Sequence, residues 1–403
     1  MLVAKNQSGL LLFLDGSKTR DELRKLQKNA YFCPQCLTKV ILKVGEFKIP
    51  HFSHKASHTC TGFSEPESLA HLEAKLQLYN WLIHSAEEAE VEKIYSGFNQ
   101  RADVGVRIQG QEYAIEFQRS RIPYRDFIKR TKEYTSHDVV PVWLLSHDVL
   151  KKPVENKISL SSFHQQFIRY SSSLKQFFLV SYDHVHQSFS TLHYLIPLSS
   201  SVFLTSKSSF PLKQVKFPHF SLQSLYYSEQ ELHIIREQRK RWLQSRLVQG
   251  KGCLDGLLSL LYEQRTNLQL LPAWVGIPVR HSLFIKEPDA EWQCFLYLLL
   301  NECKSYEKPL SLKYMLIRMN DYIDLGYLTL RQIQFQPPDT LLRAVTDYLD
   351  TLQKLGIVVK GQKGYRLCME HPYIMIDQVW DSESKKERFW MQYQDLLLET
   401  LNK

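Results

Sequence analysis

The chain has 403 residues, enough for two or three domains with cores of their own, and its 44% hydrophobic and 12% aromatic content excludes a disordered protein. Its formal net charge of +9 favours an acidic partner, most simply nucleic acid, although a mildly basic protein without such a partner has the same balance. No apolar run approaches the roughly 20 residues that span a bilayer, and the first residues do not read as a signal peptide. We therefore expect no membrane insertion and a cytoplasmic location.

Residues 1–62 are predicted to form a first domain that begins with a strand hairpin over residues 2–14, in which Leu10–Leu14 is a buried strand. The candidate ligands of a metal follow within 28 residues: Cys33, Cys36, His51, His54 and Cys60. Zn²⁺ prefers four thiolate or imidazole ligands in a tetrahedron, so the spacing predicts a closed, structural zinc site. The favoured ligands are the three cysteines and His54, with His51 left out. The alternatives are histidines unrelated to the cysteines and a redox-active cysteine pair, which would want a βαβ setting that this segment lacks.

Residues 63–150 are predicted to form a second domain with the order α-β-β-β-α-β. The predicted elements are a helix over 66–84, strands over 91–95, 102–108 and 113–117, a helix over 123–136 and a strand over 139–145. Ser64 or Glu65 is expected to cap the first helix, with Pro66 in its first position. A turn at Gly110 joins the second and third strands into a hairpin.

Two acidic residues are the strongest functional signal in this second domain. Asp103 lies in the second strand and Glu116 in the third, and Gln118 points to the same side as Glu116 because side chains alternate along a strand. Two carboxylates on one face repel each other unless a cation lies between them, and Mg²⁺ or Mn²⁺ suits such a pair. The pattern therefore predicts metal-dependent phosphodiester chemistry, with a polar strand edge as the alternative.

The first helix of this domain adds three candidate site residues at helical spacing, namely Glu67, His71 and Lys75. Lys75 is expected to supply positive charge near the metal, and His71 to contact phosphate or to transfer a proton. The alternative is a solvated helix face with ordinary ion pairs. On the second helix, Arg130 and Tyr134 are the favoured DNA contacts among a basic stretch, again with a solvated face as the alternative.

The remaining chain is predicted to divide at residue 220. Residues 151–220 read as a sheet extension or linker with strands near 177–180 and 194–197, and residues 221–403 read as mainly helical. The helices are expected over 227–249, 289–303, 310–323 and 338–355, before a basic hairpin over 356–367, so that residues 289–370 resemble a winged helix. Arg239 and Arg241 on the first of these helices are candidate DNA contacts, unless that helix is simply a charged surface helix.

The order of elements in residues 63–150, with Asp103, Glu116 and Gln118 on its strands, resembles the core of PD-(D/E)xK nucleases. In that superfamily an Asp and a Glu hold one or two metal ions, and a Lys two residues after the Glu positions the attacking water. Gln118 occupies the Lys position, which is a departure from the common pattern. The resemblance implies an α/β (α+β) class, with a restriction-endonuclease-like core between a zinc-knuckle domain and a helical C-terminal domain.

The wider order of motifs over residues 33–145 is similar to that of the competence protein CoiA family. This resemblance implies a cytosolic protein of natural transformation that helps incoming single-stranded DNA to recombine, and it implies RecA and DprA as partners. The first functional hypothesis is a Mg²⁺- or Mn²⁺-dependent deoxyribonuclease. The second is a catalytically inactive, DNA-binding scaffold on a nuclease fold, and the third is a protein–protein adaptor.

Overall fold

The computed structural model of the chain describes residues 1–55, 60, 67–220, 222–223, 226–249, 255–304, 309–334, 339–374 and 379–402. Contacts between residues divide the chain into two compact units. Unit 1 holds Met1–Lys151, Leu179–Thr191 and Lys207–Leu222, and unit 2 holds Lys152–Phe178, Leu192–Ser206 and Gln223–Lys403. Within the described residues, no helix is both long and apolar enough to cross a membrane.

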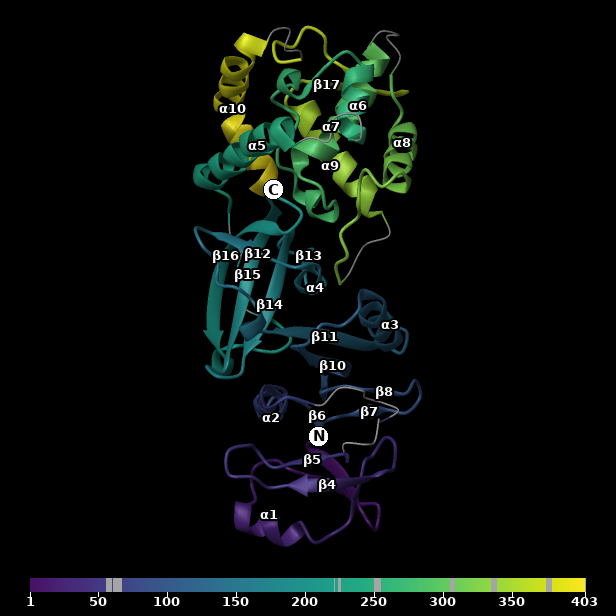
Figure 1. Cartoon of the computed structure of the whole chain (residues 1–403), viewed down its shortest axis with the longest axis vertical. Coiled ribbons are helices and arrows are strands. Elements are labelled where there is room, and N and C mark those ends of the chain that lie inside the picture. Colours follow the sequence, from purple (N-terminus) through teal and green to yellow (C-terminus); the bar gives the residue numbers. More distant parts are fainter. Residues whose placement is uncertain are drawn as a thin grey trace. The chain divides into compact units, whose positions relative to one another are not determined.

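The N-terminal part of unit 1, coloured purple in Figure 1, is an antiparallel sheet with the strand order β2-β1-β3-β4-β5 and one helix. Its elements are β1 (Val3–Asn6), β2 (Leu11–Phe13), α1 (Arg20–Leu26), β3 (Tyr31–Phe32), β4 (Lys39–Lys43) and β5 (His51–Ser53). Helix α1 begins after Thr19, whose hydroxyl accepts a hydrogen bond from the amide of Glu22 in a capping box. Leu23 of this helix packs into the same apolar cluster as Val40 and Leu42 of the sheet.

The predicted hairpin over residues 2–14 is present as β1 and β2, but the prediction of a buried strand over Leu10–Leu14 is wrong. Leu10 is 68% exposed and Leu11 is 57% exposed, and of these five residues only Leu14 is buried. The reason is that Leu10 precedes β2, while Leu11 is opposite Lys5 and points to an open face of the sheet.

The central part of unit 1 follows the predicted order of elements. These are α2 (Leu69–Leu82), β6 (Glu88–Val91), β7 (Ile94–Tyr95), β8 (Gln100–Arg101), β9 (Val104–Ile108), β10 (Gln111–Gln118), α3 (Tyr124–Thr135), β11 (Val139–Ser146) and the 3-10 helix η1 (His147–Val149). The predicted strand over 91–95 is divided between β6 and β7, and Gly110 forms the turn before β10 with a positive φ of 74°.

The predicted cap of the first helix is wrong. Helix α2 begins at Leu69, and Ser68 is its N-cap because the Ser68 side chain accepts a hydrogen bond from the amide of His71. Ser64, Glu65 and Pro66 lie outside the described residues.

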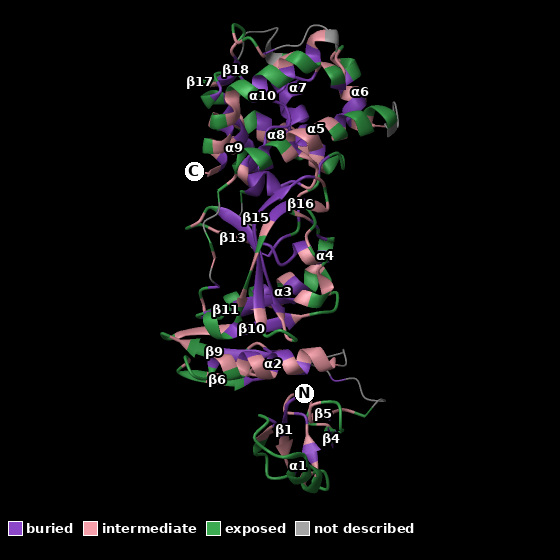
Figure 2. Ribbon diagram, turned by 90° about the vertical axis from the view of Figure 1, so that its left-hand side faces the viewer, coloured by how far each residue is buried: buried purple, intermediate pink, exposed green. Residues whose placement is uncertain are grey.

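The strands of this central part pair in the order β6-β9-β10-β11-β14, with β10 parallel to β11 and the β9–β10 hairpin antiparallel. The strands that extend this order or lie beside it are β12 (Lys157–Ser159), β13 (Arg169–Ser171), β14 (Gln176–Asp183), β15 (Ser188–Pro197) and β16 (Val202–Pro211). Between them lie α4 (Ser162–Gln165) and, after them, η2 (Leu212–Gln214). Strand β15 is buried along nearly its whole length, as its colouring in Figure 2 shows.

Two helices cover opposite faces of β10. Glu116 and Phe117 are neighbours on this strand, so their side chains point to opposite faces. Glu116 accepts a hydrogen bond from Tyr134 of α3, whereas the Phe117 ring packs edge-on against His71 of α2, with 5.6 Å between the ring centroids. Side chains at this point of the strand therefore meet α3 on one face and α2 on the other.

The helical part of unit 2 has one large apolar core and a terminal hairpin. Its elements are α5 (Glu229–Gln249), α6 (Gly256–Glu263), η4 (Leu268–Leu270), η5 (Arg280–Phe284), α7 (Asp289–Lys304), α8 (Leu312–Asp324), α9 (Thr340–Lys354), β17 (Val358–Gly361), β18 (Gly364–Leu367) and α10 (Val379–Asn402). Residues 292 and 294–300 of α7 are buried in this core. The described helices and the hairpin match the predicted ranges within a few residues, whereas α6 and α10 were not predicted. The winged-helix likeness stays a prediction.

Candidate zinc site and nuclease-like site

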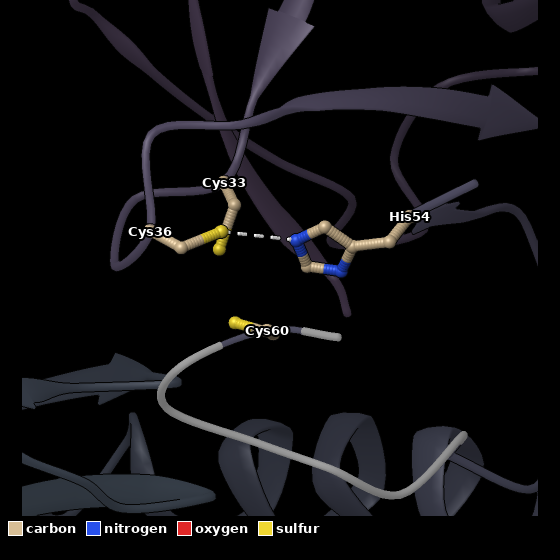
Figure 3. Close-up of side chains that lie close together, drawn as sticks. All are labelled: Cys33, Cys36, His54 and Cys60. Carbon is tan, nitrogen blue, oxygen red and sulfur yellow. Dashed lines mark hydrogen bonds between the residues drawn. The ribbon is translucent and has the colours of Figure 1, made fainter. Parts of the chain in front are cut away.

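Four candidate metal ligands meet beside the N-terminal sheet. Cys33 and Cys36 come from the turn between β3 and β4, His54 follows β5, and Cys60 lies farther along the chain. Their ligand atoms all lie within 4.8 Å of one another, and Cys36 Sγ is 3.2 Å from His54 Nε2 (Figure 3). In the part of the chain that the structure describes, no second cluster of three or more such ligands is present.

Three thiols and one imidazole are the ligand types that Zn²⁺ prefers in closed structural sites, so this cluster fits zinc. Burial raises the pKa of the Cys33 thiol to about 11, which disfavours the free thiolate that a redox-active cysteine needs at neutral pH. His51 is not part of the cluster, and its Nδ1 lies 2.9 Å from the carbonyl oxygen of Ile49. The geometry therefore selects His54 as the histidine ligand.

Lys75 of α2 is the centre of a buried ionic network in the central part of unit 1. Its side chain is fully buried, and its Nζ lies 2.8 Å from Glu67 Oε1, 2.7 Å from Glu92 Oε1 and 3.6 Å from Asp103 Oδ1. Arg101 adds a second cation, with its Nη2 3.4 Å from Glu67 Oε1. Burial alone would lower the pKa of Lys75, but the charges of the carboxylates raise it above its ordinary value. This face of α2 is therefore not the solvated surface of the alternative interpretation.

Glu92 is a member of this network that the sequence analysis did not identify. It follows β6 in a left-handed conformation, with a φ of 56°, and it is 4% exposed. Its Oε1 accepts hydrogen bonds from Lys75 and from the amide of Leu2, and its Oε2 accepts one from the amide of Val3 at 3.3 Å. Glu92 thus bonds both to the candidate site and to β1 of the N-terminal sheet.

Asp103 is held on the side of α2. Its Oδ2 lies 2.9 Å from His71 Nε2 and accepts a hydrogen bond from the amide of Phe117 at 2.9 Å. Burial alone would raise the pKa of Asp103, but the charges of His71 and Lys75 and the hydrogen bond from His71 lower it to about 2. The carboxylate in turn raises the pKa of His71, against the opposite effect of burial.

Glu116 is held on the side of α3. Its Oε1 accepts hydrogen bonds from the Tyr134 hydroxyl at 2.6 Å and from Arg130. Burial, together with the charge of Asp103, raises the pKa of Glu116 to about 7, although the Arg130 charge acts in the opposite direction. Both acidic residues are buried, Asp103 at 7% and Glu116 at 3% exposure, so they do not form a polar strand edge.

Comparison with known proteins assigns this architecture to a family. The chain is 31% identical over 347 residues to competence protein CoiA of Bacillus subtilis (strain 168), an alignment that covers 84% of this chain and 90% of the relative. This chain belongs to the competence protein CoiA family. The family models match in three parts: the N-terminal domain at residues 16–63, the nuclease-like domain at residues 67–225 and the C-terminal domain at residues 230–379. No solved structure matches the chain.

In this CoiA-family chain, the zinc-type cluster lies in the N-terminal domain with Cys60 included, and the ionic network lies in the nuclease-like domain. The nuclease-like domain therefore has two buried carboxylates, Asp103 directly before β9 and Glu116 in β10, each with a cation of the protein beside it. Gln118 lies at the end of β10 and donates a hydrogen bond to the carbonyl oxygen of Ser120 at 2.8 Å.

Two of the four predicted DNA contacts are buried in this CoiA-family chain, which does not fit contact with phosphates. Tyr134 is fully buried against Glu116, and Arg239 is 5% exposed with its guanidinium donating to the carbonyl oxygens of Val275 and Pro272. The prediction of exposed helix positions for both residues is wrong, because partners distant in the sequence bury them. Arg241 is exposed, and Arg130 keeps 18% of its side chain exposed beside Glu116. DNA contact by these two arginines stays a prediction.

Proposed function

We propose that this chain is a DNA-processing protein of competence whose nuclease-like domain cuts DNA with the help of Mg²⁺ or Mn²⁺. The observation that carries the proposal is the hydrogen bond at 2.9 Å from the amide of Phe117 to Asp103. It fixes Asp103 beside Phe117, the residue that follows Glu116 on β10, although Asp103 bonds to His71 of α2 and Glu116 to Tyr134 of α3. This arrangement supports a PD-(D/E)xK type of core.

The two carboxylates are the residues that would hold the cation, and their oxygen atoms are the ligands that Mg²⁺ and Mn²⁺ prefer. When bound, such a cation lowers the pKa of an attacking water and offsets charge on the phosphate. His71 Nε2 lies 2.9 Å from Asp103 Oδ2 and the side chain is partly exposed, which suits a residue that transfers a proton to or from the reacting phosphate group. Gln118 would orient the water through its amide group.

Lys75 supplies the positive charge that is absent at position 118. Its Nζ lies 3.6 Å from Asp103 Oδ1. Arg130 must release Glu116 before that carboxylate can bind a cation, so loading of the site is expected to depend on this arginine.

The proposed substrate is incoming single-stranded DNA or a recombination intermediate, and the proposed partners are the recombinase RecA and its loader DprA. The likeness to the competence family supports these assignments. A second candidate function is a catalytically inactive scaffold that binds DNA and recruits these partners. The neutral Gln118 and the pairing of each carboxylate with a protein cation favour this alternative.

The test is cleavage of labelled single-stranded, duplex and branched DNA by the purified full chain, with Mg²⁺, with Mn²⁺ and with no divalent cation. Omission is preferable to a chelator, because a chelator also removes zinc. Glu116→Gln is expected to lower a metal-dependent rate by about 100-fold or more, because a metal-binding carboxylate is lost. The matched control is Glu112→Gln, since Glu112 lies on the same strand and is also ion-paired, to Lys93.

Cutting that needs the cation and is lost only in Glu116→Gln would establish the nuclease. Binding of DNA without cutting by the wild-type chain, or equal cutting by Glu116→Gln and Glu112→Gln, would contradict it and favour the scaffold.

A further inference from the structure

One face of the N-terminal sheet places lysines between apolar side chains. Residues opposite each other on antiparallel strands point to the same face, and so do alternate residues of one strand. Across the sheet, Leu11 is opposite Lys5, Lys5 is opposite Phe32, and Phe32 is opposite Lys39. Ile41 and Lys43 continue this face along β4. We name it the lysine face, defined by six residues: Lys5, Leu11, Phe32, Lys39, Ile41 and Lys43.

The lysine face is open to solvent although its apolar residues are large. Leu11 is 57% exposed and Ile41 is 45% exposed, and Lys39 and Lys43 are exposed on either side of Ile41. The opposite face of β4 is the buried one, because Val40 and Leu42 are each 2% exposed in the cluster that contains Leu23 of α1. Exposed apolar side chains grouped on one face are typical of a binding surface.

The charge of this region favours a polyanion. Residues 1–55 hold ten lysine and arginine residues and four acidic residues, a net charge of +6 out of +9 for the whole chain. None of the strand residues that share the lysine face is acidic, since the residues opposite Ile41 and Lys43 on β5 are Ser53 and His51. Among the described residues, no ion pair joins the three lysines of this face to an acidic side chain.

An exposed aromatic ring lies in the segment that follows β4. Phe47 is 94% exposed, in the segment between Lys43 and His51, the last pair of opposite residues of β4 and β5. Its ring makes almost no contact with the protein and is available for stacking. Phe32, opposite Lys39 at the start of β4, is a second aromatic residue and is partly exposed.

We propose that the lysine face, together with Phe47, binds single-stranded DNA. Lys39 and Lys43 are four residues apart on one strand, about 13 Å, and Lys5 lies two strands from Lys39, about 10 Å, so the lysines reach separate phosphates. The apolar and aromatic side chains between them meet unstacked bases, which a duplex hides inside its stack. This face deepens the proposed function by supplying a strand-binding surface outside the nuclease-like site, and it rests on that function only for the choice of DNA.

The test is binding of a fluorescent oligonucleotide by the full chain in buffer without added divalent cation, at salt concentrations from 0.1 to 1 M. Lys39→Gln combined with Lys43→Gln removes two phosphate contacts, so the slope of log affinity against log salt is expected to become shallower by about 1.4. That change corresponds to roughly 25-fold weaker binding at 0.1 M salt, with affinities that converge near 1 M. The matched control is Lys25→Gln with Lys28→Gln, because these exposed lysines lie in and after α1, which packs against the opposite face of β4.

A second variant separates stacking from charge. Phe47→Ala is expected to weaken single-strand binding about fivefold or more without changing the salt slope, because one base loses its stacking partner. Since Phe47 is 94% exposed, this change leaves the packing of the domain intact, which thermal unfolding of the variant checks.

Equal affinity of the Lys39/Lys43 variant and the wild-type chain would overturn the proposal, and so would an equal loss in the Lys25/Lys28 control. The proposal would also be overturned if duplex DNA competed for binding as well as single-stranded DNA and Phe47→Ala left the affinity unchanged. If no oligonucleotide binds at low salt, the proposal fails and an acidic partner protein becomes the better occupant. Lost cleavage with intact binding would count against the nuclease-like site alone, so the two failures are distinguishable.

Discussion

Replacement of Lys75 by methionine is expected to destabilise unit 1 by an amount that grows with pH. Methionine keeps most of the side-chain volume but removes the Lys75 ammonium group, which lies 2.7 Å from Glu92 Oε1 in the wild-type chain. Glu92 then lacks this cation. A buried carboxylate without a partner takes up a proton rather than stay charged. Protonation of a carboxyl group with an ordinary pKa of 4.5 costs about 1.4 kcal/mol for each pH unit above that value. The expected loss is therefore about 3.4 kcal/mol at pH 7 and about 0.7 kcal/mol at pH 5.

The direction of this pH dependence follows from the pKa of Glu92 in the wild-type chain and in Lys75→Met. In the wild-type chain, burial would raise this pKa, but Lys75 lowers it, so the stabilisation is present above pH 4.5 and is lost as the pH falls through the folded value. In Lys75→Met the folded pKa is raised instead, and stability falls as the pH rises. The difference between the two proteins therefore widens from pH 5 to pH 7.

Hydrogen exchange of the slowest amides of α2 measures this difference in the free energy of opening. Arg119→Met is the matched control, because the Arg119–Asp148 pair has a similar distance of 2.8 Å but is 46% and 39% exposed. The control is expected to lose less than about 1 kcal/mol at either pH. A loss below about 1 kcal/mol in Lys75→Met that does not change with pH would refute the view that Lys75 is the buried counter-charge of Glu92.

Three further outcomes are expected. The purified chain should hold one zinc ion, and metal analysis should show it lost in Cys36→Ser but retained in Cys294→Ser, since Cys294 is buried outside the cluster. Burial raises the pKa of Asp289 to about 7, so unit 2 should lose up to about 4 kcal/mol between pH 4 and pH 7, and urea unfolding at pH 8 should find Asp289→Asn more stable than the wild-type chain. Gly364 has a φ of 138° and would bring a Cβ within 2.3 Å of a backbone oxygen, so Gly364→Ala should lower the melting temperature clearly more than Gly110→Ala, which has open space and a φ of 74°. Similar melting of the two alanine variants, zinc retained in Cys36→Ser, or no gain in Asp289→Asn would each contradict the corresponding expectation.

Local signals in the sequence were sufficient for most helices and strands of the described chain. Helix α2 and the β9–β10 hairpin follow from periodic apolar residues and from a turn glycine, and these act over a few residues. The metal ligands could be predicted for the same reason, because their spacing along the chain is itself diagnostic. The exposed Leu11 of β2 shows the limit of this reasoning: an apolar run predicts burial, but the face of the sheet to which each side chain points decides it.

The partners of the candidate site residues could not be predicted, because they depend on contacts between distant segments. Glu92 stands in a stretch of alternating acidic and apolar residues that is typical of a solvated strand. In the folded chain it is buried and accepts hydrogen bonds from the amides of Leu2 and Val3, which are 90 and 89 residues away in the sequence. Tyr134 lies seven residues after Phe127, on the buried face of α3, but its partner cannot be read from this spacing, because only the packing of α3 on β10 brings its hydroxyl to Glu116. Charged residues reveal their burial only when the topology is known.

The carboxylate of Glu92 links two segments that the family models treat as separate domains, at residues 16–63 and 67–225. Leu72 and Val91 of the nuclease-like domain also belong to the apolar cluster of the N-terminal sheet. The two domains are thus expected to unfold together as one cooperative unit, and a truncated protein that begins near residue 63 would expose this shared core. Zinc bound at the knuckle would then stabilise the nuclease-like domain as well, because any ligand of a folded state stabilises everything that unfolds with it.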